Sequence, residues 1–347
     1  MNTVAGASVS PPVRVGLIGA GGIGSFHGES LARRVPRATL ASVADPAPGV
    51  AERLAASLGC PQATLEPAEL LADPSIQAVV VAAPPSVHAD LIEAAAGVGK
   101  AVFCEKPMGL TLDDADRAIK AARAAGVPLQ VGFNRRFATD FRAAHDLVAS
   151  GQLGEPQLLR SLTRDPELAD PSIIKSWTIF LETLIHDFDT LLWLNLGARA
   201  VEVYAMADAL VRPDWKDRGL LDTAMVMVRF DNGAMATAEA SFQAVYGYHV
   251  RGEVFGSAGM VTAGDVRRMR STTFYGEKGV VHDTVRRNVD LFHDAYTGEL
   301  AHFVDCVRNG TGPDCTGEDA RAALAIALAA IESVRTGRPV RREEVET

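Results

Sequence analysis

The chain of 347 residues is 48% hydrophobic and 22% charged, and it carries a formal net charge of −9 at pH 7. That length predicts two domains rather than a single core. The acidic balance argues against nucleic acid or an anionic membrane as the main partner, and no apolar run reaches the roughly 18 residues that predict a membrane span. Composition therefore favours an enzyme or a binding protein that acts on a small molecule.

The N-terminal segment, residues 1–12, lacks the basic and apolar regions of a signal peptide, and we expect it to be a disordered leader. The cysteines show neither CxxC spacing nor a metal-type cluster, so we expect reduced thiols, no metal site and a cytoplasmic location. They are Cys60, Cys104, Cys306 and Cys315.

Residues 13–133 alternate short apolar runs with alanine-rich helical patterns. The runs are VRVGLIGAGGIG, TLASVAD, QAVVVAAPP, KAVFCEKP and PLQVGF. Apolar strands separated by helices predict a parallel sheet that is covered on both faces. We therefore expect an α/β fold that begins with a Rossmann dinucleotide-binding domain.

A glycine-rich turn follows the first of these strands, with GxGxxG spacing, and Asp45 ends the next strand. The glycines allow a tight turn and close approach of the backbone to a pyrophosphate, and the acid accepts hydrogen bonds from ribose hydroxyls and repels a 2′-phosphate. This pattern predicts NAD rather than NADP. His88 either faces the cofactor or simply begins a helix. The predicted cofactor-binding residues are Gly19, Gly21, Gly22, Ile23, Gly24, Asp45, Pro84, His88, Glu105 and Lys106.

The dipeptide Glu105-Lys106 ends the strand predicted at KAVFCEKP and precedes Pro107. Ligands bind at the carboxyl ends of the strands in such sheets. A lysine at this place can donate to a substrate hydroxyl and stabilise its oxygen as negative charge develops. The alternative is a surface lysine without a catalytic role.

Residues 134–347 have a different sequence pattern: the predicted strands are longer, apolar and polar residues alternate along them, and Asn232-Gly233 is a strong hairpin signal. The segments AMVMVRF, AMATAEASF, YHVRGEVFG and GMVTAG predict a large, predominantly antiparallel open sheet in a substrate-binding and oligomerisation α+β domain. A helix is expected at about 317–336, with Gly337 as its stop, and it is expected to pack back on the first domain.

The segment FLETLIHDFD, residues 180–189, places Glu182, His186 and Asp189 on one face of a predicted helix. It is either an ion-paired helix with a core histidine or an acid–base site, because the unperturbed pKa of histidine near 6.5 suits proton transfer. Asp187 lies on another face, where we expect it to be solvated or to cap the helix.

Several separated motifs, in order, resemble the Gfo/Idh/MocA family and within it the inositol 2-dehydrogenases. They are EKP (105–107), QVGFNRRF (130–137), RDP (164–166), IHDFD (185–189), DTAMV (222–226) and YGYHVRGEVFGSAGM (246–260). The resemblance implies that Lys106 and His186 are the catalytic pair. His186 would take the hydroxyl proton as hydride leaves for NAD, Lys106 would steady the oxygen, and Glu182 or Asp189 would orient the imidazole.

The same resemblance implies a cyclitol substrate, with oxidation of myo-inositol to 2-keto-myo-inositol as the reference reaction. The implied substrate contacts are Asn134, Asp165, Tyr246 and Tyr248, although Asp165 could be only a turn residue and the tyrosines could only pack the sheet. It also implies a homotetramer, or a homodimer, built through the open sheet.

Two departures leave the substrate open. Glu182 stands where inositol dehydrogenases usually have aspartate, and His249-Val250 where they usually have Asp-Gln. Scyllo-inositol, an aminocyclitol, an inosose and a pyranose sugar are alternative substrates for the same chemistry. A non-catalytic NAD-binding sugar sensor and a non-redox glycoside hydrolase that retains NAD are alternatives of other classes.

Overall fold

The computed structural model of the protein describes residues 11–167, 174–218, 220–277 and 279–346. Most of the predicted leader lies outside these residues. The described chain forms two compact units. The N-terminal unit contains residues 11–105, 120–130 and 300–314, and the C-terminal unit contains residues 106–119, 131–299 and 315–346. No helix in the described parts of the chain is long and apolar enough to cross a membrane.

The N-terminal unit is built on a sheet with the strand order β3-β2-β1-β4-β5-β6, in which the pairings among the first five strands are parallel. The strands are β1 (Val13–Ile18), β2 (Ala38–Ala44), β3 (Ala63–Thr64), β4 (Ala78–Val81), β5 (Ala101–Glu105) and β6 (Leu129–Gly132). All four residues of β4 have no exposed surface, as expected for a strand covered on both faces. The predicted Rossmann-type sheet is confirmed.

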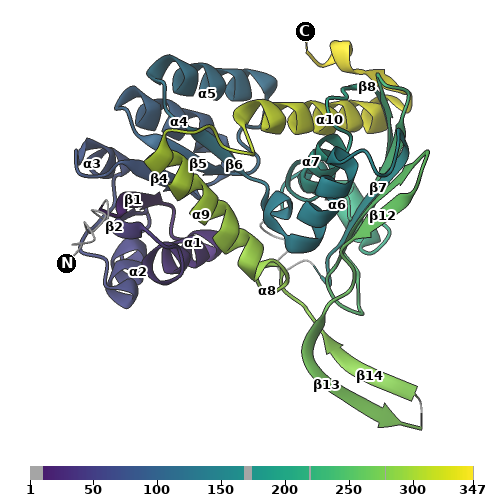
Figure 1. Ribbon diagram of the computed structural model, residues 1–347, viewed down its shortest axis with the longest axis horizontal. Helices are drawn as coiled ribbons and strands as arrows, with labels where there is room; N and C mark the ends of the chain where they lie inside the picture. Colours follow the sequence, from purple (N-terminus) through teal and green to yellow (C-terminus); the bar gives the residue numbers. More distant parts are fainter. Residues whose placement is uncertain (1–10, 168–173, 219, 278, 347) are drawn as a thin grey trace, which may run out of the picture. The chain divides into compact units, whose positions relative to one another are not determined.

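Helices between these strands pack on the sheet (Figure 1). They are α1 (Gly22–Arg33), α2 (Val50–Leu58), α3 (Pro67–Ala72) and α4 (His88–Gly97), with the short 3₁₀ turn η1 (Pro85–Val87) before α4. The next helix, α5 (Leu112–Ala125), has residues in both units. The core of this unit joins Leu17 and Val43 of the sheet to Leu31 of α1 and to Phe303. Phe303 belongs to α9 (His293–Asn309), and its ring packs edge-on against that of Phe103.

The C-terminal unit is built on a seven-stranded sheet with the order β12-β11-β7-β10-β9-β8-β15. The strands are β7 (Pro156–Arg164), β8 (Ala200–Asp208), β9 (Thr223–Phe230), β10 (Met235–Ser241), β11 (His249–Gly256), β12 (Met260–Ala263) and β15 (Val340–Arg341). Only the β7–β10 pair is parallel among the described pairings. The predicted, mostly antiparallel sheet and the hairpin at Asn232-Gly233 are confirmed.

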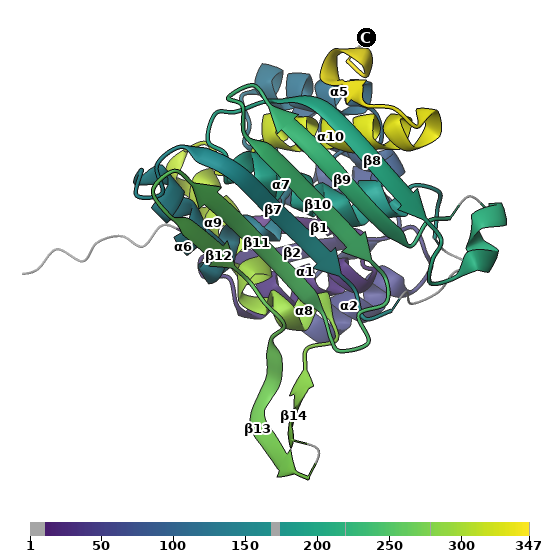
Figure 2. The ribbon, with the colours of Figure 1, turned by 90° about the vertical axis from the view of Figure 1, so that its right-hand side faces the viewer.

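One face of this sheet is covered by helices and the other is open (Figure 2). The covering helices are α6 (Thr139–Ala149), α7 (Ile185–Trp193) and α10 (Gly317–Thr336). Burial alternates strictly along β9, which is the signature of a sheet with one buried face. The open face carries large apolar side chains that are at least 44% exposed: Leu158, Met206, Met225, Met227, Met235 and Phe255.

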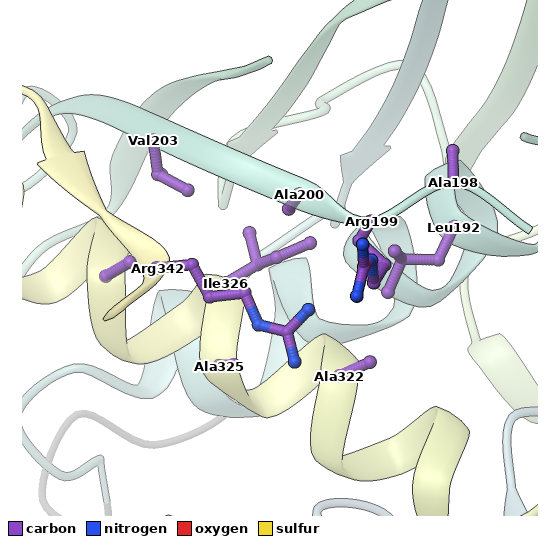
Figure 3. A pocket seen from close by; sticks show the side chains of 10 residues that line it. Leu192, Ala198, Arg199, Ala200, Val203, Ala322, Ala325, Ile326 and Arg342 are labelled. Atoms are coloured by element: carbon purple, nitrogen blue, oxygen red, sulfur yellow. The ribbon is translucent and has the colours of Figure 1, made fainter. Parts of the chain in front are cut away.

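Helix α10 begins at a capping box between Thr316 and Asp319 and ends at Gly337, whose φ of 69° is left-handed. The predicted helix is therefore confirmed. Its alanine-rich side leaves a small cavity of about 50 Å³ against β8 and the end of α7 (Figure 3). The cavity is lined by Leu192, Ala198, Arg199, Ala200, Val203, Ala322, Ala325, Ile326, Ala329 and Arg342.

A separate two-stranded hairpin, β13 (Arg268–Gly276) and β14 (Gly279–Thr284), extends away from the seven-stranded sheet of the C-terminal unit (Figures 1 and 2). The remaining short elements of the chain are helical. They are η2 (Asn134–Phe137), the π-helical turn η3 (Ile179–Leu184), η4 (Pro213–Arg218), α8 (Asn288–Leu291) and η5 (Arg342–Glu344).

Candidate functional site

The glycine-rich turn lies between β1 and α1 in the N-terminal unit. A Cβ atom on Gly19 would lie 2.5 Å from the main-chain oxygen of Ala82, and one on Gly24 would lie 2.1 Å from that of Gly19, so the fold itself needs both glycines. At Gly21 and Gly22 a Cβ would meet nothing within 4 Å. The fold does not require these two glycines, and the open space at them fits close approach of a pyrophosphate.

The first turn of α1 suits an anion. It has no acidic residue, and its N-cap, Gly21, has no side chain that could cap the helix. The free N–H groups and the positive end of the helix dipole therefore remain available for a phosphate. Ile23 is half-buried in this turn.

Asp45 follows β2 and is held beside the glycine-rich turn. Its Oδ2 accepts a hydrogen bond from the Ala20 N–H at 2.8 Å, and its Oδ1 accepts one from the Ala47 N–H at 2.9 Å. The carboxylate is thus fixed at the C-terminal edge of the parallel sheet, where a dinucleotide ribose is bound in such folds.

The other predicted cofactor residues have different surroundings. Pro84 is exposed at the start of η1, and the Nε2 of the buried His88 lies 2.7 Å from the main-chain oxygen of Ala83. His88 begins α4, so it fixes the turn after β4. Glu105 is 6% exposed and its Oε1 lies 2.6 Å from Nε2 of His27 on α1. His27 could not be predicted as a partner of Glu105, because a lone histidine in a helix gives no signal.

Lys106 begins the part of the chain that belongs to the C-terminal unit, and the peptide bond from it to Pro107 is cis. Its Nζ donates a hydrogen bond of 2.8 Å to the main-chain oxygen of Glu182. Glu182 lies in the π-helical turn η3, which places its carbonyl at the lysine while its side chain remains exposed. π-helical turns of this kind often occur at functional sites.

His186 lies in the first turn of α7, and its ring packs edge-on against Phe133 with 5.8 Å between the ring centroids. Its Nδ1 is buried and has no hydrogen-bond partner among the described residues. Burial lowers the pKa of His186 well below its usual 6.5, and the charges of Lys106 and Arg135 lower it further. The imidazole is therefore neutral at neutral pH and able to accept a proton.

Asp165 follows β7 and pairs with Tyr248. Burial raises the pKa of Asp165 to about 6, against the hydrogen bond from Tyr248 and the charges of Arg135 and Lys106, which lower it. Burial and the adjacent carboxylate raise the pKa of Tyr248 well above 10, so its hydroxyl stays a donor. The Oδ1 of Asp165 is buried and has no hydrogen-bond partner among the described residues. Asp165, Tyr248, Lys106 and His186 thus belong to one electrostatic cluster.

Asp187 does not behave as predicted. It has no exposed surface and pairs with Arg135, whose Nη1 lies 2.8 Å from its Oδ1. The hydroxyls of Ser161 and Thr163 on β7 donate to the two oxygens of this carboxylate. The expectation that Asp187 is solvated or caps the helix was wrong. A buried carboxylate is tolerated here because β7 presents hydroxyl groups that donate hydrogen bonds to it.

Asp189 is likewise buried, with an exposed fraction of 1%, and Arg136 holds it in a bidentate pair through Nε at 3.0 Å and Nη2 at 2.5 Å. No described hydrogen bond joins Asp189 to His186. Arg136 takes up the Asp189 carboxylate, so orientation of the His186 imidazole by Glu182 or Asp189 stays a prediction.

Two further predicted substrate contacts, Asn134 and Tyr246, differ in exposure. Asn134 is 2% exposed and begins η2, directly before Arg135. Tyr246 is 44% exposed, and its hydroxyl lies 3.1 Å from Nδ1 of His249. The residue that marks the departure from the family pattern, His249, therefore contacts a predicted substrate tyrosine.

The parallel sheet, the glycine-rich turn and the aspartate after β2 define the class of the protein as an NAD-binding oxidoreductase fold joined to a second domain. Residues 13–133 match the sequence model of the oxidoreductase family with an NAD-binding Rossmann fold, and residues 141–262 match that of the GFO/IDH/MocA C-terminal domain. The chain belongs to the Gfo/Idh/MocA family.

Several similar proteins carry the names of inositol dehydrogenases. The chain is 38% identical to the scyllo-inositol 2-dehydrogenase (NAD(+)) of Bacillus subtilis, over 94% of this chain and 96% of that protein. It is 37% identical to the myo-inositol 2-dehydrogenase of Thermotoga maritima, over 96% and 99%. The crystal structure of scyllo-inositol dehydrogenase from Lactobacillus casei, with bound NAD(H) and scyllo-inositol, superposes with a TM-score of 0.91 at 28% identity, over 96% and 99% of the two chains.

Proposed function

We propose that the protein oxidises a secondary hydroxyl of a cyclitol with NAD, and that myo-inositol is converted to 2-keto-myo-inositol. The observation that carries the proposal is the buried Nδ1 of His186, which has no hydrogen-bond partner among the described residues, in one electrostatic cluster with Lys106. Bound NAD would supply the hydride acceptor, and Gly21, Gly22 and Asp45 would hold it. The products are the ketone, NADH and one proton.

The proton step falls to His186. Hydride can leave a carbinol carbon only as the hydroxyl proton is removed, so a base must face that hydroxyl. His186 is uncharged at neutral pH because burial and the charges of Lys106 and Arg135 disfavour its imidazolium form. The same cations limit its basicity, so the proton that it takes can pass on readily to solvent.

Lys106 would donate a hydrogen bond to the reacting oxygen while negative charge develops there. The main-chain oxygen of Glu182 aligns the ammonium group through the 2.8 Å hydrogen bond.

Recognition of a polyol needs several polar groups in one place. Asp165 supplies an acceptor whose hydrogen-bonding capacity is only partly used, since its Oδ1 has no partner among the described residues. The Tyr248 hydroxyl donates its proton to Asp165, and its oxygen can accept a hydrogen bond from the substrate. Such a site rejects ring analogues that leave its polar groups unpaired. We extend the proposed substrate contacts to Asn134, Tyr246 and the side chain of Glu182. Scyllo-inositol, an aminocyclitol, an inosose and a pyranose remain alternative substrates.

A non-catalytic sugar sensor is the alternative of another class. It would bind NAD and a polyol without turnover, and it would need neither Lys106 nor a neutral His186. Both groups are present and share one electrostatic environment, which favours the enzyme.

We further propose a cytoplasmic homo-oligomer, with a tetramer favoured over a dimer. The open face of the sheet, with Met206, Met225 and Met227 more than half exposed, is the surface that would be buried between copies.

A spectrophotometric panel tests the function. The purified protein is mixed with NAD, or with NADP in parallel, and with myo-inositol, scyllo-inositol, an aminocyclitol or glucose, and the absorbance of reduced nicotinamide is followed. We expect NAD-dependent growth of the signal with myo-inositol. A signal with another ring alone would change the substrate and keep the chemistry. Silence across the panel, with NAD binding intact, would contradict the proposed dehydrogenase.

A further inference from the structure

Trp177 has a backbone conformation that tryptophan rarely adopts. Its φ is 68°, and Arg37 is the only other non-glycine residue with a positive φ among the described residues. A bulky residue in this left-handed region is an outlier, because its Cβ atom is crowded by the main chain. Such a conformation persists only where the surrounding structure determines it, and it is found most often at functional sites. The contacts of Trp177 must therefore hold it in place.

The main chain of Trp177 leads into the π-helical turn η3. Its carbonyl oxygen accepts hydrogen bonds from the N–H groups of Phe180, at 2.9 Å, and of Leu181, at 3.0 Å. The turn runs from Ile179 to Leu184 and directly precedes α7. Because two N–H groups in the first half of the turn donate to this one carbonyl, the conformation of Trp177 sets where the turn begins.

The indole ring joins this turn to α10. The guanidinium carbon of Arg335, in the last turn of α10, lies 4.9 Å from the centroid of the ring, which is the geometry of a cation–π interaction. The ring also contacts that of Phe180 in η3, with 6.3 Å between the centroids, and Phe180 has no exposed surface. The half-buried ring of Trp177 is thus attached both to a core residue of the turn and to a helix that packs against the turn.

The same turn holds the proposed catalytic lysine. The main-chain oxygen of Glu182, within η3, accepts the 2.8 Å hydrogen bond from Nζ of Lys106. A carbonyl moves with its turn, so a change in where η3 begins would displace the ammonium group. A displacement of about 1 Å at a reacting group can cost about 100-fold in rate.

We propose that the Trp177 ring fixes the start of η3 and thereby positions Lys106 for the reaction. Trp177 is a positioning residue, because it acts through the turn and the lysine rather than by contact with the substrate. The effect on turnover rests on the proposed function, whereas the effect on the turn rests on the contacts of Trp177 alone.

Three substitutions separate the ring from the backbone. Trp177→Phe keeps an aromatic face for Arg335, Trp177→Ala removes the ring and leaves a strained φ, and Trp177→Gly removes the ring and relieves the strain. We expect kcat with NAD and myo-inositol to fall about 10- to 100-fold in the alanine and glycine variants, and less than about 5-fold in Trp177→Phe. Wild-type kcat in Trp177→Gly, or equal losses in Trp177→Phe and Trp177→Ala, would overturn the proposal.

The cation has a matched control. Arg335→Met removes the guanidinium over Trp177, and Arg142→Met removes one that lies 5.3 Å from the ring centroid of Trp193. We expect Arg335→Met to lower kcat about 2- to 5-fold in the wild type and not at all in Trp177→Ala, and Arg142→Met to leave kcat unchanged. Equal losses in the two methionine variants would contradict the role of the ring.

The pH profile distinguishes positioning from a loss of stability. Burial lowers the pKa of His186, and the charges of Lys106 and Arg135 lower it further. A displaced lysine would let that pKa rise, so the acid limb of kcat/KM should move to higher pH in Trp177→Ala and stay in place in Trp177→Phe. An unmoved acid limb in Trp177→Ala would overturn the positioning of Lys106.

Hydrogen exchange tests the turn without reference to catalysis. The peptide that covers residues 178–186 should exchange at least about 10-fold faster in Trp177→Ala and Trp177→Gly than in the wild type, and at the wild-type rate in Trp177→Phe. Wild-type protection in Trp177→Ala would overturn the proposal even if turnover falls. A wild type without turnover would contradict the proposed function, and the exchange rates would still decide whether the ring fixes the turn.

Discussion

Arg135 and Asp187 form a buried ion pair in the C-terminal unit, with 2.8 Å between Nη1 and Oδ1 and exposed fractions of 3% and 0% for the two side chains. The hydroxyls of Ser161 and Thr163 complete the hydrogen bonding of the carboxylate. Asp187 directly follows His186 in the chain, and the charge of Arg135 lowers the pKa of His186. Arg135 therefore has two effects: it pairs with a buried carboxylate of this unit, and it lowers the pKa of the proposed base.

Removal of one member of this pair should be costly. The substitution Arg135→Met leaves the Asp187 carboxylate buried and without its cation, and we expect a loss of about 3–5 kcal/mol in the free energy of unfolding. Urea denaturation measures the change. The control Arg199→Met breaks a pair on the surface, where Arg199 is 74% exposed, and should change stability little. Equal losses in the two variants would contradict the buried network.

The activity of the proposed enzyme should persist to unusually low pH for a histidine base. Because the pKa of His186 lies well below 6.5, the imidazole stays unprotonated as the pH falls through 6.5. We expect the acid limb of kcat/KM that reports this histidine to lie below pH 6.5, and Arg135→Met to move it upward because one nearby cation is lost. A pH–rate profile of both proteins checks this prediction. An acid limb of kcat/KM near pH 7 in the wild type would contradict it.

We expect the buried carboxylate of Asp165 to lower the free energy of unfolding at pH 7 while it contributes to substrate binding. Its pKa is about 6 in the folded protein against an ordinary value of 3.8. Ionisation is thus harder in the folded state, which costs roughly 3 kcal/mol of stability at pH 7, and the cost is relieved as the pH falls from 6 towards 4. Asp165→Asn should therefore raise the melting temperature at pH 7, with a smaller gain at pH 4, and weaken substrate binding.

Tyr248→Phe provides the matching control for Asp165. The hydrogen bond from Tyr248 lowers the pKa of Asp165, so its loss should raise that pKa above 6 and shift any pH dependence of KM upward. An unchanged pH dependence in Tyr248→Phe would show that Asp165 does not contribute to binding.

The cavity beside α10 allows a stabilising substitution (Figure 3). Ala322→Leu would fill space in a cavity of about 50 Å³, and we expect a gain of up to about 1 kcal/mol. Ala323→Leu on the same helix should lose about 1–3 kcal/mol, because Ala323 has no exposed surface and does not line the cavity. Thermal unfolding of the two variants should show shifts of opposite sign.

Local patterns were sufficient to predict much of the fold. The runs of β-branched residues before Gly19 and Asp45 specify buried parallel strands, and the alternation in β9 specifies a sheet with one open face. Asn232-Gly233 and Gly337 mark their turn and helix end because their backbone conformations favour few other residues. In each case the signal lies within a few residues of the structure that it determines.

The parts that could not be predicted depend on distant residues. The ion pairs of Asp187 with Arg135 and of Asp189 with Arg136 span 52 and 53 positions, and no periodicity within α7 indicates them. The π-helical turn at Ile179–Leu184 departs from the regular α-helical spacing before His186, and a helical wheel with 3.6 residues per turn cannot show it. Here tertiary contacts decide the local geometry.

The most direct test of the central claim compares the wild type with His186→Gln at saturating NAD and myo-inositol, following NADH formation, with NAD binding measured by calorimetry. His293→Gln serves as the control, since the His293 side chain is 43% exposed and the residue is not among the predicted site residues. We predict that His186→Gln lowers kcat by about 10²–10⁴-fold while NAD binds equally to all three proteins. Near wild-type turnover by His186→Gln would contradict the assignment of this histidine as the base.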